Sequence, residues 1–227
     1  MENILTVNNI EKYYGGKSNI TKAIDNISFT IDKGEFVFVI GTTGSGKSTF
    51  IKLLYREETP SNGVVTIGNV NVANLPNYKV PNLRRCMGIV FQDYKLLHNQ
   101  SVYDNVAYVI RTLGYSSREI EARVLGALKI VDLDNKIKAK ASELSGGEQQ
   151  SVSIVNGPPL LIADEPTGNL DPKNSLEIMQ ILEQINLKGI TLIISTHDKA
   201  MVNHFRKRVI TLQNGEIVRD ELGGTYE

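Results

Sequence analysis

The sequence predicts an α/β fold with a largely parallel core sheet, an N-terminal antiparallel β subdomain and an inserted α-helical subdomain. Three patterns carry this prediction: short runs that are apolar on both faces, a first third in which apolar and polar residues alternate, and a helical stretch from residue 102 to 144. We expect one domain of 227 residues, in which residues 1–92 and 157–227 form the β subdomain and core. Residues 93–156 form the helical subdomain.

The core strands are predicted by apolar runs of strand length. A strand in a sheet that is covered on both faces has no reason to alternate, so it reads as a continuous apolar run. Five runs fit this description: 36–40 (FVFVI), 87–91 (MGIVF), 160–163 (LLIA), 191–195 (TLIIS) and 209–212 (VITL). We expect them to form the parallel core.

The remaining patterns predict the two subdomains. Residues 4–10, 23–31 and 63–72 alternate apolar with polar residues and are punctuated by Gly and Asn, as half-exposed antiparallel strands are. Residues 102–114 and 118–133 instead carry apolar residues at helical spacing. The core is therefore expected to be interrupted by helices.

The amino-acid composition disfavours several classes of function. Twenty-five basic and 25 acidic residues give zero net charge, which disfavours nucleic-acid binding. The polar start MENILTVNNIEK lacks the features of a signal peptide, and no apolar run has membrane-spanning length, so a soluble, cytoplasmic protein is expected. The single cysteine, Cys86, cannot form an internal disulfide. We expect it to be a small buried residue that precedes a strand.

The strongest chemical motif is GTTGSGKST, which directly follows the run 36–40 and precedes a helical pattern. It fits G-x-x-x-x-G-K-[ST], in which glycines let successive N–H groups point at phosphate oxygens and the helix N-terminus adds its positive end. Lys47 supplies a charge to the β- and γ-phosphates, and the Ser48 hydroxyl is suited to ligate Mg²⁺. The alternative, a glycine-rich turn that binds nothing, is disfavoured because the lysine and serine are in register. The nucleotide-binding residues are predicted to be Gly41, Thr42, Thr43, Gly44, Ser45, Gly46, Lys47, Ser48 and Thr49.

A carboxylate pair follows the apolar run 160–163. Asp164 and Glu165 come at the carboxyl end of this predicted strand, where open α/β sheets usually bind ligands. Asp164 is expected to hold the Mg²⁺ shell, and Glu165 to face a water as general base. Alone, two adjacent acids are more often a solvated turn, but the upstream phosphate-binding motif favours a P-loop (RecA-like) core.

In this order the motifs resemble those of the ATP-binding cassette (ABC) ATPases over nearly the whole chain. The resemblance adds Gln92 in VFQD, the signature LSGGEQQ, GNLD and His197 in STHD. It implies that Gln92 ligates Mg²⁺ and that Gln92, Lys47, Glu165 and His197 are catalytic. It also implies that Tyr14, rather than Tyr13, stacks on adenine. Further nucleotide contacts are implied for Ser145, Gly146, Gly147, Glu148 and Asp171.

The resemblance further implies an ATP-dependent head-to-tail homodimer. In this family Ser145 and Gly147 of one subunit would grip the γ-phosphate that is seated on Lys47 of the other. Serine hydroxyl, glycine N–H groups and a helix N-terminus suit a phosphate for the same reason as the P-loop does. Each nucleotide site is therefore incomplete until ATP holds the two subunits together.

Within the family, the segments LLYREE, FQDYKLL and ADEPTGNLDP are most similar to the FtsE branch of cell-division ATPases. This implies a protein peripheral on the inner face of the membrane that binds an FtsX-type membrane protein and controls cell-wall hydrolases. We expect the membrane partner to contact Tyr55, Tyr94, Leu97 and Tyr103. Alternatives are the ATPase of a MacB or lipoprotein-release exporter and an ATP-sensing module with little turnover. A translation or DNA-repair ABC protein is disfavoured by the single cassette and neutral charge.

The sequence departs from the family after the signature. An arginine usually follows LSGGEQQ, but here Ser151 stands in its place, and the segment up to Pro159 is about four residues short. At ~1.5 Å per residue the helix would lose roughly 6 Å while its faces rotate by only about 40°. We therefore expect the chain to fold and to bind Mg-ATP, but to close its dimer poorly and hydrolyse slowly.

Overall fold

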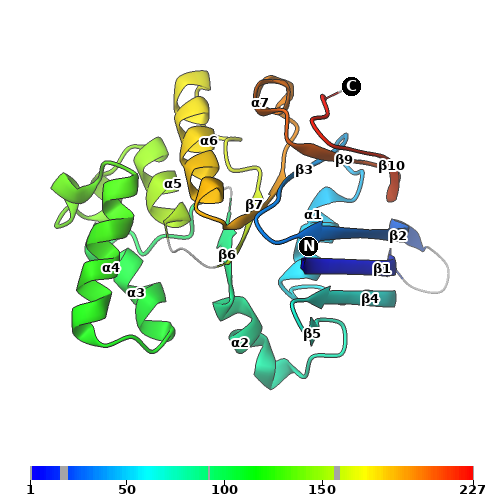
Figure 1. Cartoon of the computed structure of the whole chain (residues 1–227), viewed down its shortest axis with the longest axis horizontal. Helices are drawn as coiled ribbons and strands as arrows, with labels where there is room; N and C mark the ends of the chain where they lie inside the picture. Colours follow the sequence, from blue (N-terminus) through cyan, green and yellow to red (C-terminus); the bar gives the residue numbers. More distant parts are fainter. Residues whose placement is uncertain (1, 16–19, 92, 156–158, 227) are drawn as a thin grey trace.

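The computed structural model describes residues 2–15, 20–91, 93–155 and 159–226. Two sheets lie next to each other, and a group of helices projects from the side opposite the antiparallel sheet (Figure 1). No described helix has the length and apolar composition that crossing a membrane requires. The predicted α/β architecture, with an antiparallel β subdomain and a helical insertion, is confirmed.

The larger sheet has six strands in the order β10-β9-β3-β8-β7-β6. Strand β3 pairs in parallel with β8 and β9, and β7 pairs in parallel with β8 and β6. Only β10, which the sequence analysis missed, is antiparallel to its neighbour β9. The strands are β3 (Phe36–Ile40), β6 (Met87–Val90), β7 (Leu160–Asp164), β8 (Thr191–Ser195), β9 (Arg208–Gln213) and β10 (Glu216–Glu221).

The smaller sheet has the strand order β2-β1-β4-β5 and is antiparallel throughout. Its strands are β1 (Asn3–Tyr14), β2 (Thr21–Asp32), β4 (Asn62–Ile67) and β5 (Val70–Asn71). The alternating residues place Leu5 and Val7 on the buried face of β1 and leave the next residue, Asn8, exposed. The antiparallel subdomain predicted from alternation is confirmed.

The helices begin where capping residues and apolar spacing place them. Ser101 caps the first helix of the insertion through its hydroxyl, which accepts from the Asp104 N–H, and Ser116 forms a capping box with Glu119 at the next. The helices are α1 (Lys47–Leu54), α2 (Val80–Arg85), α3 (Val102–Thr112), α4 (Ser117–Ile130), α5 (Gly146–Ile154), α6 (Pro172–Leu187) and α7 (Lys199–Phe205).

Strand β3 divides the hydrophobic core into two layers. Because side chains alternate along a strand, Val37 and Val39 pack with α1 and the antiparallel sheet, whereas Phe36, Phe38 and Ile40 pack with α6 and α7. Burying one such side chain stabilises the fold by about 1.5–3 kcal/mol. A third cluster holds α3, α4 and α5 together. The loops at the carboxyl ends of β3, β7 and β8 are thereby fixed on a rigid support.

Two expectations are wrong. Tyr55 is only 5% exposed, because its ring packs in the core at the end of α1 and its hydroxyl donates to Glu57 Oε2 at 2.8 Å. In this conformation it offers no surface to a membrane partner. Cys86 precedes strand β6 as expected, but it is exposed rather than buried, because it lies at the C-terminal end of α2.

Candidate nucleotide site

The loop between β3 and α1 is a backbone cradle. Gly41 has φ 149°, and a Cβ there would lie 2.2 Å from the Leu212 carbonyl oxygen. Gly46 has φ 108°, and its Cβ would lie 2.4 Å from the Ala23 carbonyl oxygen. Both positions therefore require glycine. Helix α1 starts directly after Gly46, so its free N–H groups face the loop.

Two polar side chains in the cradle fit a phosphate ligand. Lys47 is 8% exposed, and its ammonium donates to the carbonyls of Gly41 at 2.7 Å and Thr42 at 3.1 Å. The Ser45 hydroxyl is buried and has no hydrogen-bond partner among the described residues. An unsatisfied buried hydroxyl costs about 1–3 kcal/mol. A phosphate oxygen at the loop would satisfy it and draw Lys47 away from its own backbone.

The predicted carboxylates lie at the carboxyl end of strand β7, beside the end of its parallel neighbour β8. Strands β7 and β8 pair so that Asp164 is opposite Ser195, and the Ser195 hydroxyl donates to Asp164 Oδ1. Glu165 follows in the left-handed region with φ 49°. Its Oε2 lies 2.8 Å from His197 Nδ1, although the two residues are 32 positions apart. The structure thus brings Glu165 and His197, both named from the sequence, into direct contact.

A cavity of about 490 Å³ opens beside this pair. Glu165 and His197 line it together with Thr167, Asp198 and Lys199. The Glu165 side chain is 18% exposed and that of His197 is 69% exposed. The carboxylate is therefore sheltered while the imidazole remains accessible. Burial, with a smaller effect of the Glu165 charge, raises the pKa of Tyr226 near the C-terminus.

The two tyrosines near the end of β1 differ in their surroundings. Tyr14 is half-buried, and its ring centroid lies 4.8 Å from the Lys12 ammonium, which is itself fixed by Glu58 Oε2 at 2.7 Å. Tyr13 hydrogen-bonds Glu11, which raises the pKa of its hydroxyl. Because its hydroxyl is occupied by Glu11, Tyr13 is tied to its own sheet. The rings of both tyrosines lie near a lysine, Tyr14 with Lys12 at 4.8 Å and Tyr13 with Lys22 at 5.7 Å, so these contacts do not decide which ring stacks on adenine.

Helix α5 carries the signature at its N-terminus. Ser145 is the N-cap: its hydroxyl accepts from the Glu148 N–H at 3.3 Å, and its own N–H donates to Glu148 Oε2 at 3.0 Å. Lys136 lies 2.5 Å from Glu148 Oε1. Burial alone would raise the pKa of Glu148, but the bonds from Lys136 and Ser145 outweigh it and lower the pKa. The capping box is therefore held by an ionised carboxylate.

The signature glycines sit where neighbouring elements approach closely. A Cβ at Gly146 would lie 3.1 Å from the Tyr94 hydroxyl oxygen, and one at Gly147 would lie 3.2 Å from Asn174 Oδ1. Asn174 in turn is bonded to Asp171, the N-cap of α6. The N–H groups of Asn174 and Lys173 lower the pKa of Asp171 despite some desolvation. The N-terminus of α6 therefore connects the signature glycine Gly147 to Asp171, which is predicted to contact nucleotide.

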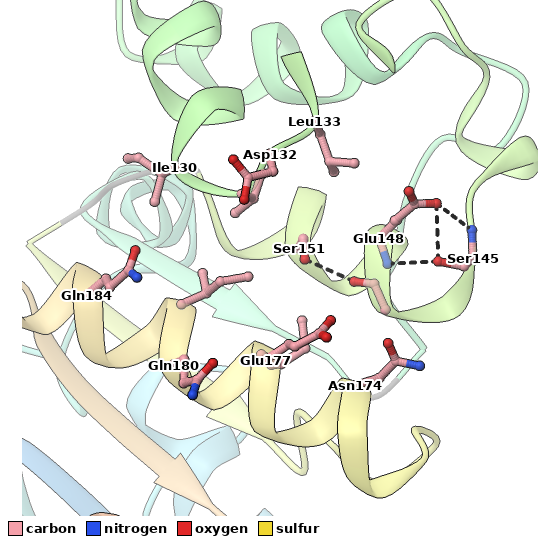
Figure 2. Close-up of a pocket in the computed structure, with 14 residues that line it drawn as sticks. Ile130, Asp132, Leu133, Ser145, Glu148, Ser151, Asn174, Glu177, Gln180 and Gln184 are labelled. Atoms are coloured by element: carbon pink, nitrogen blue, oxygen red, sulfur yellow. Dashed lines mark hydrogen bonds between the residues drawn. The ribbon is translucent and has the colours of Figure 1, made fainter. Parts of the chain in front are cut away.

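A cleft of about 360 Å³ lies beside α5, between α6 and the turn after α4. Ser151 faces it, and Figure 2 shows Ser151 between the turn that carries Asp132 and the α6 residue Glu177. Ser151 is only 6% exposed, and its hydroxyl donates to the Gly147 carbonyl at 3.0 Å. Acidic residues and no basic one appear among the described residues that line the cleft. A larger, positively charged side chain at position 151 would have room in the cleft and acidic residues near it.

The two halves of the predicted site lie apart within one chain. Figure 1 shows α1 on one side of β7 and α5 on the other, next to α6. The signature of a single chain therefore cannot reach a nucleotide on its own P-loop in this conformation. Predicted Gln92 lies outside the described residues, as do Gly157 and Pro158 of the shortened connection. Thr42, Thr43 and Gly44 are exposed on the loop, whereas Ser48 is exposed and Thr49 half-buried in the first turn of α1.

Three residues that organise the site were not predicted from the sequence. Ser195 orients Asp164, Lys136 holds the Glu148 capping box, and Asn174 packs on Gly147. The only available signal was the position of Ser195 at the carboxyl end of a predicted strand. Lys136 and Asn174 lie in segments whose pairing with α5 depends on tertiary structure.

Comparisons with known proteins agree with this geometry. Residues 24–168 match the family model described as ABC transporter. The cell-division ATP-binding protein FtsE of Bacillus subtilis is 47% identical over 221 residues, which cover 96% of this chain and 97% of the relative. FtsE of Escherichia coli is 41% identical over 209 residues, which cover 90% and 92%.

Solved structures match over nearly the whole chain. A dimeric post-hydrolysis state of the ATP-binding cassette MJ0796, bound to ADP and Pi, has a TM-score of 0.85 at 33% identity and covers 98% of this chain and 100% of that chain. CbiO1 of Clostridium perfringens has a TM-score of 0.88 at 30% identity, with coverages of 98% and 90%.

These features together define one class of protein. A P-loop lies ahead of a carboxylate pair at the end of a strand, a signature helix lies in a separate helical layer, and the family model matches. The chain belongs to the ABC transporter family as an ATP-binding cassette. Within that class it is an FtsE-type cell-division ATP-binding subunit of an ABC transporter-like complex.

Proposed function

We propose that the chain hydrolyses Mg-ATP in composite sites, each built from the P-loop of one copy and the signature helix of another. The observation that carries the proposal is the contact between Glu165 Oε2 and His197 Nδ1 at 2.8 Å, beside the end of the strand that bears Asp164. A chain that only senses ATP has no need of a carboxylate paired with an imidazole. Substitution of Glu165, described in the Discussion, tests this proposal.

Magnesium fits the donor set of the site. The exposed Ser48 hydroxyl and the Asp164 carboxylate are oxygen donors of the kind Mg²⁺ prefers, and Gln92 would add an amide oxygen. Since Ser195 already donates to one oxygen of Asp164, the carboxylate is oriented and its other oxygen remains available. Mg²⁺ would neutralise charge on the β- and γ-phosphates during transfer.

Glu165 and His197 would act on the attacking water. Glu165 would take a proton from the water as it attacks the γ-phosphorus, and the bond to the leaving oxygen of ADP would break in line. His197 Nδ1 holds Glu165 Oε2, so the second carboxylate oxygen is left for the water. The Lys47 ammonium would exchange its two carbonyl partners for phosphate oxygens.

Closure of the dimer would rearrange the signature cap. In the single chain the Ser145 hydroxyl also donates to Glu148 Oε2 at 3.1 Å. To bind a γ-phosphate of the opposite copy, it would redirect that proton to the phosphate, while Lys136 continues to pair with Glu148. The N–H groups at the start of α5 face the same ligand. The signature is therefore capped and ordered before the nucleotide arrives.

The membrane partner would dock beside the helical layer. An FtsX-type protein is implied by the family branch, and Leu97 is the most exposed of the expected contact residues at 48%. Buried Asn105 fixes the segment that carries it: its Oδ1 accepts from the Leu97 N–H at 2.7 Å, and its Nδ2 donates to the Leu97 and Ser101 carbonyls. Tyr94 and Tyr103 are half-buried near it. We propose that these three residues, without Tyr55, receive the partner, which would transmit ATP-driven motion to cell-wall hydrolases.

Leu97→Glu is expected to reduce recovery of the chain with membranes that contain the partner by roughly tenfold or more, the effect of about 1.4 kcal/mol. A charge forced into an apolar interface remains unpaired. Sedimentation of membranes after co-expression measures this. Leu187→Glu on α6, where the leucine is 79% exposed, is the matched control and should leave recovery unchanged. Loss of ATP binding together with membrane recovery in Leu97→Glu would show that Leu97 supports the fold instead.

Ser151→Arg, combined with an Ala-Arg-Ala-Ile insertion after Ile154, is expected to raise the steady-state ATPase rate severalfold. The arginine would enter the cleft beside Asp132 and Glu177, and the insertion would lengthen α5 by about one turn. The same insertion with Ser151→Met is the matched control, because methionine fills space without charge. Equal rates for the native and restored chains would mean that the shortening has no functional effect.

A further inference from the structure

A second cavity, of about 480 Å³, lies between the antiparallel sheet and α2, away from the nucleotide loops. Figure 1 shows α2 beside β4 and β5 at the lower edge of the molecule. The floor of this cavity is apolar. Ile4, Ile67, Leu83 and Leu160 line it and are each at most 8% exposed. A concave, mainly apolar lining is typical of small-molecule sites.

The rim of the cavity is cationic. Lys33 and Lys79 line it, and none of the described lining residues is acidic. Lys33 pairs with Glu2 at 2.6 Å, but both side chains are more than half exposed, so solvent weakens this pair. No carboxylate in the described part of the chain lies within ion-pair distance of Lys79; its ammonium lies 5.7 Å from the Tyr78 ring centroid. A positive charge therefore remains free at the mouth of an apolar pocket.

We propose that this cavity binds an anionic amphiphile, a medium-chain carboxylate with its tail on the apolar floor and its headgroup at Lys79. Each buried CH₂ group contributes about 0.8 kcal/mol, so the tail supplies most of the affinity. The volume lies within the ~300–1,000 Å³ of typical ligand pockets. The lysines select an anionic headgroup over a neutral or cationic one. This proposal does not depend on ATP hydrolysis.

Cys86 provides a reporter inside the site. It is the only cysteine of the chain, it lines the cavity, and its exposed thiol donates to the Asn82 carbonyl at 3.4 Å. The probe is decanoate, below its micelle concentration. We expect decanoate to slow the reaction of Cys86 with N-ethylmaleimide severalfold, and decyltrimethylammonium, which has the same tail, to leave the rate unchanged.

Charge-reversal variants distinguish the contribution of the headgroup from that of the tail. Lys79→Glu should abolish protection, whereas Lys129→Glu, the same charge change on the remote α4, should preserve it. Rates with and without decanoate are compared within each variant, since the substitution itself can alter the thiol. Thermal unfolding and titration calorimetry with decanoate confirm that each variant is folded and measure binding directly. Absence of protection and of binding heat in the native chain would overturn the proposal. Equal protection by both amphiphiles would overturn the assigned headgroup.

Discussion

Lys47→Ala is expected to abolish measurable ATP binding. Among the described residues the buried ammonium has only two backbone carbonyls as partners, so a bound triphosphate would supply the opposite charge that they lack. A hydrogen bond to a charged group contributes about 1.5–3 kcal/mol, so two such bonds correspond to a loss of roughly 100-fold or more in affinity. Equilibrium binding of a fluorescent ATP analogue measures the effect.

The control for Lys47→Ala lies on the same helix. Lys52 is part of α1 but pairs with Glu57 at 3.3 Å, with both side chains more than 40% exposed. Lys52→Ala should therefore leave nucleotide affinity within about twofold, because exposed pairs contribute only ~0–1 kcal/mol. Equal losses in both variants would show that α1 tolerates neither change and that the loss is not specific to the phosphate contact. Thermal unfolding of both proteins distinguishes a misfolded variant.

Glu165→Gln is expected to reduce ATP turnover by roughly 10²–10⁴-fold, the usual contribution of a general base. Glutamine has the shape of glutamate and retains an oxygen that can accept from His197, so the local geometry should persist. Nucleotide affinity should remain close to that of the native chain. Phosphate release under saturating Mg-ATP measures turnover.

Glu177→Gln on α6 is the matched control for charge. Glu177 is exposed and pairs with Lys173 only at 3.9 Å, so the same neutralisation there should leave turnover nearly unchanged. If Glu165→Gln turns over as fast as the native chain, Glu165 is not the base. The ATP-sensing alternative would then account better for the chain.

The strands could be predicted from the sequence because each one has a pattern set by its burial. The run FVFVI is buried on both faces between two core layers, and its prediction matches β3 to the residue. Strand β10 was missed because Glu216, Arg219, Asp220 and Glu221 interrupt any apolar pattern at this edge of the sheet. Tyr55 and Cys86 were misplaced because helix ends decide their exposure, and ends are poorly defined by periodicity.

The site could be predicted where local spacing carries the chemistry. The P-loop needs glycines, lysine and serine at fixed positions along one segment, so its cradle follows from sequence. The bond from Ser195 to Asp164 and the approach of Tyr94 to Gly146 join segments far apart in the chain. Such contacts depend on strand order and helix packing, which a single sequence does not specify.

The mass of Glu165→Gln in solution with Mg-ATP tests the composite site most directly. Light scattering should show a species of twice the 25.1 kDa of one chain that reverts when ATP is removed. Adding Gly147→Asp, which introduces a carboxylate where the phosphate of the opposite copy would lie, should keep the protein monomeric with ATP still bound. A Glu165→Gln protein that stays monomeric at saturating Mg-ATP, or a dimer that is indifferent to Gly147→Asp, would contradict the shared-site account.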